Sequence, residues 1–360
     1  MAVAPQSRLP KVAGGQVSAF EIVDLRAVSG RALARLFEEE ERHWREQLHW
    51  DYRPSVEMVR KHVEAHSLPG YVALRQGTVV GYCFFVYEDE KGLLGDLYVL
   101  ESYRHERPYG DGAGIATILL QHALETLEHA PPVRRIEAQL IPFGVEPLEP
   151  LFQAHSFESF ARLFMYKPLA PKGWPHRSPA RGGAGVGGGE QAAPEPGPTP
   201  GVKLRAWDDS YFEAMADLIV DSYSSHVDSR INNHYGSSAG ALRFLKNIVV
   251  FPGCGIFQRD ASLVALEPGD RAGEHLLGAV LTSQVARGVG HITQICVRRR
   301  WQQRGVGRRL LVAALDHLAA KGYTGVSLTV TAENAAAVTL YRQLDFAVTK
   351  EFAAFARNLR

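Results

Sequence analysis

The stretch "WQQRGVGRR", from Trp301 to Arg309, places two glycines one residue apart among three arginines. It follows the apolar run "ITQICV" at Ile292, and leucines and alanines with the spacing of one helical face come directly after it. The sequence therefore predicts a strand, a glycine loop and a helix. The free N–H groups and the dipole at the start of such a helix favour an anion, and glycines let the backbone approach it closely.

Two common phosphate-binding loops do not fit this stretch. A Walker loop requires G-x-x-x-x-G-K-[ST], and the chain contains no Gly-Lys pair. A dinucleotide-binding loop requires G-x-G-x-x-G, and Leu310 stands where the third glycine belongs. A tight turn that binds nothing remains the structural alternative. The pattern [Q/R]-x-x-G-x-[G/A] fits the residues from Gln302 to Gly307.

A second motif, "ENAAAVTLYRQLDF", follows one predicted strand later. Together the two motifs resemble those of the GCN5-related N-acetyltransferases, the GNAT superfamily. In that family the glycine loop holds the pyrophosphate of acetyl-coenzyme A (acetyl-CoA), and the second motif reads N-x-x-A-x-x-L-Y-x-x-x-G-F. The residues that match this second pattern are Asn334, Ala337, Leu340, Tyr341 and Phe346. Asp345 stands in place of the glycine, which puts the local turn geometry in question.

The chain of 360 residues divides into two halves around a segment rich in Gly, Pro and Ala. This segment, residues 170–201, is too poor in large apolar side chains to bury a core, and we predict a linker. Both halves repeat one order of elements: strand, helices, hairpin strands, then strand, glycine loop, helix, strand, short helix and strand. The resemblance implies an α/β (α+β) fold of two tandem GNAT-like domains, residues 1–169 and 202–360. Each would be a mixed, mostly antiparallel twisted sheet with flanking helices.

Composition narrows the function classes. The formal net charge of +1 and the single arginine cluster argue against a nucleic-acid partner. The three cysteines are far apart, which argues against a disulfide scaffold or zinc site and favours a reducing compartment. No stretch has the length and apolarity of a membrane span or a signal peptide. We therefore expect a cytoplasmic protein without metal or membrane partner; the sequence carries no signal for an oligomeric state.

The resemblance implies a set of residues around acetyl-CoA, the expected acyl donor. These are Cys296, Val297, Gln302, Gln303, Arg304, Gly305, Val306, Gly307, Arg308 and Asn334. Cys296 and Val297 end a strand that splays from its neighbour in the family and exposes backbone groups to the pantetheine arm. The Cys296 side chain itself is expected to pack in the core. Asn334 is either a cofactor contact or only a helix N-cap, a position that asparagine favours.

Two residues are candidates for proton transfer. Tyr341 matches the tyrosine that acts as general acid toward the thiolate in the family, and a tyrosine with its ordinary pKa near ~10 is protonated at neutral pH. The alternative is a core tyrosine, because Tyr341 shares a helical face with apolar residues. His291 lies six residues before Val297 on the same strand face and resembles the position of a catalytic glutamate in several relatives. It is the candidate base; the alternative is a polar residue at the strand start.

The acceptor is expected to contact "SYSSHVDSRINNHYGS", Ser222 to Ser237. The candidate substrate-binding residues are Tyr223, His226, Asp228 and Tyr235. Asp228 would attract an ammonium group, and the alternative is a solvated polar loop. A small-molecule amine, a protein N-terminus or a lysine would each fit as acceptor.

The first half departs from the family motifs. In "YGDGAGIATILL" the position of the leading Gln or Arg is Asp111 or Tyr109, and an aspartate would repel a pyrophosphate. In "EPLFQAHSF" Phe152 stands where the family has its tyrosine, and Ser156 stands in the glycine position. We predict that this half is catalytically silent.

The sequence thus predicts an acetyl-CoA-dependent N-acetyltransferase with its active site in the second half and a primary amine as acceptor. Two alternatives stay open. One is a non-catalytic acyl-CoA-binding sensor or interaction protein. The other is a tandem acetyltransferase similar to mycothiol synthases.

Overall fold

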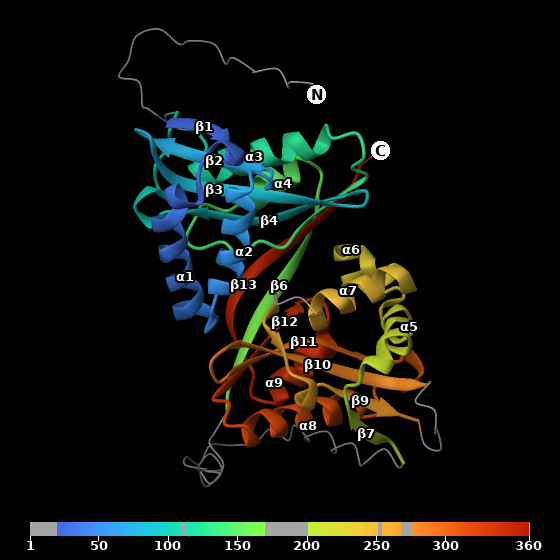
Figure 1. The fold of residues 1–360 in the computed structure, drawn as a ribbon. Coiled ribbons are helices and arrows are strands. Elements are labelled where there is room, and N and C mark those ends of the chain that lie inside the picture. The colour runs from blue at the N-terminus through green and yellow to red at the C-terminus, as the bar shows by residue number, and fades with distance from the viewer. Residues whose placement is uncertain (1–19, 110–111, 170–200, 251–253, 268–274, 360) are drawn as a thin grey trace, which may run out of the picture.

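The computed structural model describes residues 20–109, 112–169, 201–250, 254–267 and 275–359 (Figure 1). The first half forms β1 (Phe20–Asp24), α1 (Ala34–Leu48), α2 (Arg53–Glu64), β2 (Gly70–Arg75), β3 (Thr78–Glu88), β4 (Lys91–Val99), α3 (Ile115–Glu128), β5 (Arg135–Ala138), α4 (Glu149–Ala154) and β6 (Glu158–Pro168). The second half forms β7 (Lys203–Ala206), α5 (Phe212–Tyr223), α6 (Asp228–Ile231), η5 (Asn233–Gly236), α7 (Ser238–Val250), β8 (Ile256–Phe257), β9 (Leu263–Leu266), β10 (Leu276–Ala286), β11 (Val289–Val297), α8 (Val306–Ala320), β12 (Gly325–Thr331), α9 (Ala335–Gln343) and β13 (Ala347–Asn358). The predicted linker lies outside the described residues except for Gly201.

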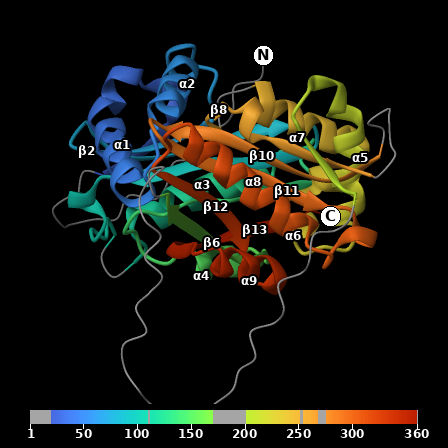
Figure 2. The same cartoon turned by 90° about the horizontal axis from the view of Figure 1, so that it is seen from below.

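Strands of both halves join in one mixed sheet. Across the described residues the order is β1-β2-β3-β4-β5-β13-β6-β12-β11-β10-β9-β7, with β8 beside β10. The pairs β4–β5 and β11–β12 are parallel, and the other pairings among the described strands are antiparallel. The predicted fold class is confirmed: a mixed, mostly antiparallel sheet with flanking helices. Figure 2 shows the paired helices α1–α2 and α5–α7 at opposite sides of the molecule.

The last strand of each half is exchanged with the other half. The strand β6 pairs with β12 from Gly325↔Pro168 to Thr331↔Arg162, while β13 pairs with β5. The two exchanged strands also pair with each other over most of their length, and they run side by side between the halves in Figure 1. Each parallel strand pair therefore has a strand from the other half beside it: β13 lies next to β5, and β6 lies next to β12. The proposed domain boundary after residue 169 divides the chain in sequence, whereas the sheet is continuous through both halves.

The cores of the two halves incorporate the exchanged strands. Phe355 of β13 is buried in the core of the first half, where its ring stacks on Phe152 at 3.7 Å between centroids. Leu163 and Met165 of β6 are buried in the core of the second half. Alternate residues of one strand face one side of a sheet, so each exchanged strand supplies a core-facing set to its host. Burial of these side chains stabilises the exchanged pairing by about 2 kcal/mol for each large one.

The two positions where family glycines are replaced keep the left-handed backbone. Ser156 has φ 58° and Asp345 has φ 61°, each four residues after the residue at the tyrosine position. A short polar side chain tolerates this conformation better than most, although glycine avoids its cost altogether. The replacement of glycine by Asp345 therefore leaves the turn after α9 intact.

Candidate active site

A bulge in β11 opens the sheet at the centre of the second half. The parallel pairing of β11 with β12 runs from Val289↔Gly325 to Ile292↔Leu328 and stops there. On its other side, β11 has one extra residue, Thr293, between its pairs with β10. A bulge bends its strand and re-aims the residues that follow. The remaining residues of β11 therefore turn away from β12, which stays paired with β6 to Thr331.

The opening is the floor of a cavity of about 730 Å³. Cys296 and Val297, at the far end of β11, line it, as the splayed strand predicted. The Cys296 side chain is buried, and burial raises the pKa of its thiol to about 12. A thiol with that pKa is not a nucleophile at neutral pH, which agrees with a packing role for the side chain.

The glycine loop forms one end of the cavity. Gly305 has φ 80° and is the residue before α8, and Gln303 is also left-handed with φ 59°. The Gln302 side chain donates a hydrogen bond to the Val297 carbonyl at 3.0 Å, which fastens the loop to the end of β11. The loop residues that line the cavity are Gln302, Gln303, Gly305, Gly307 and Arg308. This end of the cavity therefore presents the start of a helix to a bound anion.

Two predicted loop residues point elsewhere. Val306 is 1% exposed and packs in the core beneath α8. The Arg304 guanidinium lies over the Trp301 ring, 5.2 Å from its centroid. Neither residue lines the cavity in this structure.

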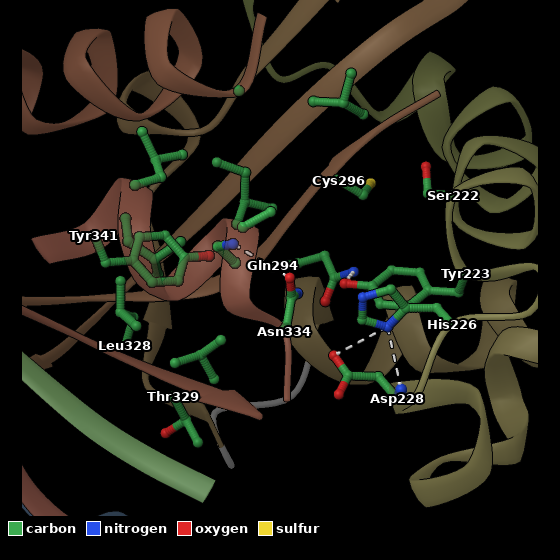
Figure 3. A pocket seen from close by; sticks show the side chains of 18 of the residues that line it. Ser222, Tyr223, His226, Asp228, Gln294, Cys296, Leu328, Thr329, Asn334 and Tyr341 are labelled. Carbon is green, nitrogen blue, oxygen red and sulfur yellow. Dashed lines mark hydrogen bonds and ion pairs between the residues drawn. The ribbon is translucent and has the colours of Figure 1, made fainter. Parts of the chain in front are cut away.

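Tyr341 lies on α9 with its ring in the core and its hydroxyl turned into the cavity (Figure 3). Its ring packs edge-on against Phe346 at 6.0 Å between centroids. Among the described residues the hydroxyl has no hydrogen-bond partner. Burial, and then the nearby Asp228 carboxylate, raises the pKa of Tyr341 above its ordinary value. The hydroxyl is therefore a protonated donor without a partner in the cavity.

Asn334 is a helix N-cap that also faces the cavity. Its side chain accepts a hydrogen bond from the Ala337 N–H at 3.2 Å, so it is the N-cap of α9. It also lines the cavity (Figure 3). The cap needs no ligand, and contact with a cofactor stays a prediction.

His291 lines the cavity from a buried position. Its Nδ1 lies 2.8 Å from the Ser327 hydroxyl, and its ring packs against Phe164 and against Trp50, which belongs to the first half. Burial lowers the pKa of His291 to about 3. A neutral imidazole with so low a pKa has little driving force to accept a proton from an ammonium. The role of base stays a prediction, and this environment argues against it.

The buried imidazole predicts an acid-sensitive component of stability. The folded pKa of His291 lies below its unfolded value, so its contribution is complete above pH ~6.5 and is lost as the pH falls toward about 3. We expect His291→Asn to remove a pH-dependent part of the unfolding free energy on the order of a few kcal/mol. Urea unfolding of both proteins at a series of pH values measures the difference. Parallel pH dependence in the two proteins would refute it.

The predicted acceptor segment closes the side of the cavity opposite α9. Tyr223 and Tyr235 stack at 4.3 Å between centroids, and Gln294 of β11 donates a hydrogen bond to the Tyr223 hydroxyl at 2.9 Å. His226 and Asp228 stand beside them (Figure 3). All four predicted acceptor residues therefore line the same cavity as the glycine loop and Tyr341.

The two exchanged strands and the segment after β5 supply lining residues that the sequence did not predict. Gln139 and Ile141 follow β5, Arg162 lies on β6, and Phe352 of the second half lies on the exchanged strand β13. No local motif marks any of them. Arg162 reaches the cavity only because β6 pairs with β12, a contact between residues far apart in the chain.

The matching loop in the first half is occupied by a side chain of the protein itself. Glu146 accepts hydrogen bonds from the Thr117 N–H at 3.2 Å and from the Thr117 hydroxyl at 2.8 Å, at the start of α3. The same carboxylate lies so close to Gly114 that a Cβ there would be 2.3 Å from Oε1. A carboxylate thus holds the place at the helix start that an anion would take. Asp111 lies outside the described residues.

The splayed strand of the first half is also covered from within. Gly95 is the extra residue of β4, matching the bulge of β11. Beyond it, Tyr98 is 1% exposed, lies 2.6 Å from His43 Nδ1, and packs against the Phe143 ring. Phe152, at the tyrosine position, is fully buried and carries no hydroxyl. The first half therefore lacks the arrangement that forms the cavity of the second.

In the part of the chain that the structure describes, no group of three or more His, Cys, Asp or Glu side chains is placed to hold a metal ion. No helix within the described ranges is long and apolar enough to cross a membrane.

Comparison with known proteins decides the family. The model of the Acetyltransferase (GNAT) family matches residues 31–155 and 243–346, well over half of the chain. The chain belongs to the GNAT acetyltransferase family. The family model matches two regions in tandem, and enzymes of this family use acetyl-CoA as donor.

Relatives match over short segments. The chain is 43% identical over 72 residues to a mycothiol acetyltransferase of Saccharopolyspora erythraea, and 40% identical over 70 residues to that of Nocardia farcinica. These segments cover 20% and 19% of this chain, and 24% and 23% of the relatives. The matches thus span about a quarter of the relatives' length.

Solved structures share the fold along nearly the whole chain. A GCN5-related N-acetyltransferase from Sphaerobacter thermophilus has a TM-score of 0.60 at 18% identity, covering 95% of this chain and 96% of that one. A tandem GNAT protein from the clavulanic acid biosynthesis pathway has a TM-score of 0.51 at 14% identity, covering 95% and 99%. At these identities the likeness concerns the fold alone.

Proposed function

We propose that this GNAT enzyme transfers the acetyl group of acetyl-CoA to a primary amine of a small molecule at the cavity of the second half. The observation that carries the proposal is the Tyr341 hydroxyl, which is protonated and has no hydrogen-bond partner among the described residues, inside the cavity that begins at the glycine loop. The pyrophosphate would lie at the start of α8, and the pantetheine arm would follow the splayed end of β11. The thioester would then reach Tyr341.

The proposed reaction uses few protein groups. The ammonium of the acceptor loses a proton to water in the cavity, and the neutral amine attacks the thioester carbon. The C–S bond breaks, the new C–N bond forms, and the thiolate takes the proton of the Tyr341 hydroxyl. The proton released by the nitrogen returns to Tyr341 through water. The Val297 N–H is the proposed donor to the acetyl oxygen.

The test is release of coenzyme A thiol from acetyl-CoA across a panel of amines. The panel contains glucosamine, alanine amide, spermidine and a lysine-containing peptide. We expect amine-dependent thiol release, together with an acetylated product of the matching mass. Tight binding of acetyl-CoA without acetyl transfer to any amine would instead favour the acyl-CoA sensor.

A second candidate is a tandem acetyltransferase that acts in mycothiol synthesis. It is favoured by the short matches to mycothiol acetyltransferases. The corresponding test is restoration of mycothiol in a bacterial strain that lacks its mycothiol acetyltransferase. Restoration by this chain would select the second candidate, and failure with a well-expressed chain would remove it.

Domain roles and location complete the proposal. We propose that residues 202–360 carry the active site, that residues 1–169 are catalytically silent, and that residues 170–201 link them. The three cysteines have free thiols, which supports a reducing, cytoplasmic location.

A further inference from the structure

Asp228 is held at the cavity by one residue from each half of the chain. It begins α6, and its side chain is 17% exposed. The Arg162 guanidinium lies 3.3 Å from Asp228 Oδ1 and donates a hydrogen bond to the Thr331 hydroxyl at 2.6 Å. Thr331 in turn donates to the same Oδ1. One carboxylate oxygen is therefore fully engaged by an arginine and a hydroxyl.

Among the described residues, the other carboxylate oxygen has no comparable donor. Oδ2 lies 3.8 Å from the Nδ1 of His226, which is beyond hydrogen-bond distance. That Nδ1 already accepts a hydrogen bond from the Asp228 backbone N–H at 3.1 Å, so it carries a lone pair and no proton to offer. Oδ2 is thus an acceptor without a donor, and Figure 3 shows the carboxylate turned toward the space between Asp228 and Tyr341.

The arginine is present because of the strand exchange. Arg162 lies on β6 of the first half, directly opposite Thr331 in the register of β6 with β12. On the other side, Phe352 of β13 lies opposite Arg162. A second half with its own closing strand beside β12 would place a different residue there. The first half therefore supplies a side chain to the cavity that is proposed as the active site.

We infer that Asp228 is the anchor for the ammonium group of the acceptor, and that Arg162 is a positioning residue that directs the free Oδ2 toward it. The inference rests on the proposed function and identifies the acceptor side of the same cavity. By holding Oδ1, Arg162 and Thr331 fix the rotation of the carboxylate. The Arg162 guanidinium also balances the charge of the carboxylate, since an isolated carboxylate in so buried a position would be costly.

The lining indicates the class of acceptor. Asp228 is the acidic side chain among the described residues that line the cavity, and Arg162 already balances part of its charge. The polar side chains that line the same cavity include the uncharged ones of Gln139, Asn232 and Thr329. Such a site fits an amine with one positive charge and neutral hydrogen-bonding groups, such as hydroxyls or amides. A polyamine would place a second charge near Arg162 or Arg308, where it would be repelled.

The first experiment measures steady-state kinetics for the best amine of the panel with Arg162→Met, Asp228→Asn and the double variant. We expect Arg162→Met to raise the KM for the amine at least about tenfold, because the Asp228 carboxylate loses the partner that directs Oδ2 toward the ammonium. The KM for acetyl-CoA should stay within about twofold, because the donor lies at the other end of the cavity. Arg162→Lys should recover part of the loss, and the double variant should be no worse than Asp228→Asn alone.

A matched control is Arg357→Met. Arg357 lies on the other exchanged strand and contacts the Glu128 carboxylate outside the cavity. The Arg357→Met substitution removes a comparable ion pair of an exchanged strand, so it should leave the KM for the amine unchanged. An unchanged KM for the amine in Arg162→Met would overturn the anchor. So would losses in Arg162→Met and Asp228→Asn that multiply in the double variant.

A second experiment tests the anchor without turnover. Calorimetry measures the binding of glucosamine and of spermidine to protein saturated with coenzyme A. We expect glucosamine to bind more tightly than spermidine, and Arg162→Met to weaken it at least about tenfold. Turnover without any effect of Arg162→Met overturns the anchor alone. Arginine-dependent amine binding without turnover supports the anchor and overturns the proposed transfer. If no amine binds and none is turned over, both the anchor and the proposed transfer are overturned.

Discussion

Replacing Gly307 by glutamate is expected to weaken acetyl-CoA binding by at least about 100-fold, because a carboxylate would then occupy the start of α8 and repel the pyrophosphate. The backbone can accept the side chain. A Cβ at Gly307 would meet only the Val297 side chain, at an ordinary 3.5 Å. Calorimetric titration of the full chain with acetyl-CoA measures both the affinity and the number of sites, and we expect one site in the unaltered chain.

The first half provides the precedent for this result. There Glu146 already places a carboxylate at the start of α3, which is why we expect no second site. Gly307→Gln is the control of equal size, and it should weaken binding less than Gly307→Glu because it adds no charge. Glu146→Gln should leave the affinity of the single site unchanged. Two sites per chain, or equal binding by the glutamate variant, would contradict the assignment of the loop.

Replacing Tyr341 by phenylalanine is expected to lower kcat by about 10²–10³-fold, the usual worth of a positioned general acid. The change removes only the hydroxyl, and the contact of the ring with Phe346 remains. Affinity for acetyl-CoA should therefore stay within about twofold. Single-turnover release of coenzyme A thiol measures the chemical step directly. Because the pKa of Tyr341 is raised, the rate should show no decline from its ionisation below pH ~10.

The matched control for this prediction is Tyr323→Phe. Tyr323 is a buried tyrosine of the same half whose hydroxyl donates to Gln284 at 2.7 Å, and it does not line the cavity. Its removal should cost some stability and leave kcat nearly unchanged. A fall in kcat of the same size in both variants would indicate a structural effect. An unchanged kcat in Tyr341→Phe would refute the role of general acid.

Features that depend on neighbours in the chain were predictable from the sequence. The glycine loop and α8 follow from the spacing of Gly305, Gly307 and the leucines after them. The placement of Tyr341 inside its helix follows from the 3.6-residue period. The turn after α9 was put in question by Asp345, and the structure keeps it, because aspartate tolerates the left-handed backbone.

Features that depend on partners far away in the chain could not be predicted from the sequence. Nothing near Glu146 in the sequence indicates that it caps α3, because the contact crosses a strand and a loop. Burial lowers the pKa of His291 and so keeps its imidazole neutral. The strand pattern at that position does not reveal the aromatic rings that surround it. The exchange of β6 and β13 could not be predicted either, since no short motif in either strand indicates which half it closes.

The sequence by itself determined the family, the repeated order of elements, the anion-binding loop and the residues grouped around it, since all of these are set by local spacing and backbone preference. Only the tertiary structure decided which strand lies beside β12, and with it the arrival of Arg162 at Asp228. Strand pairing is selected by the burial of whole faces across long stretches of chain. No short run of residues carries that choice.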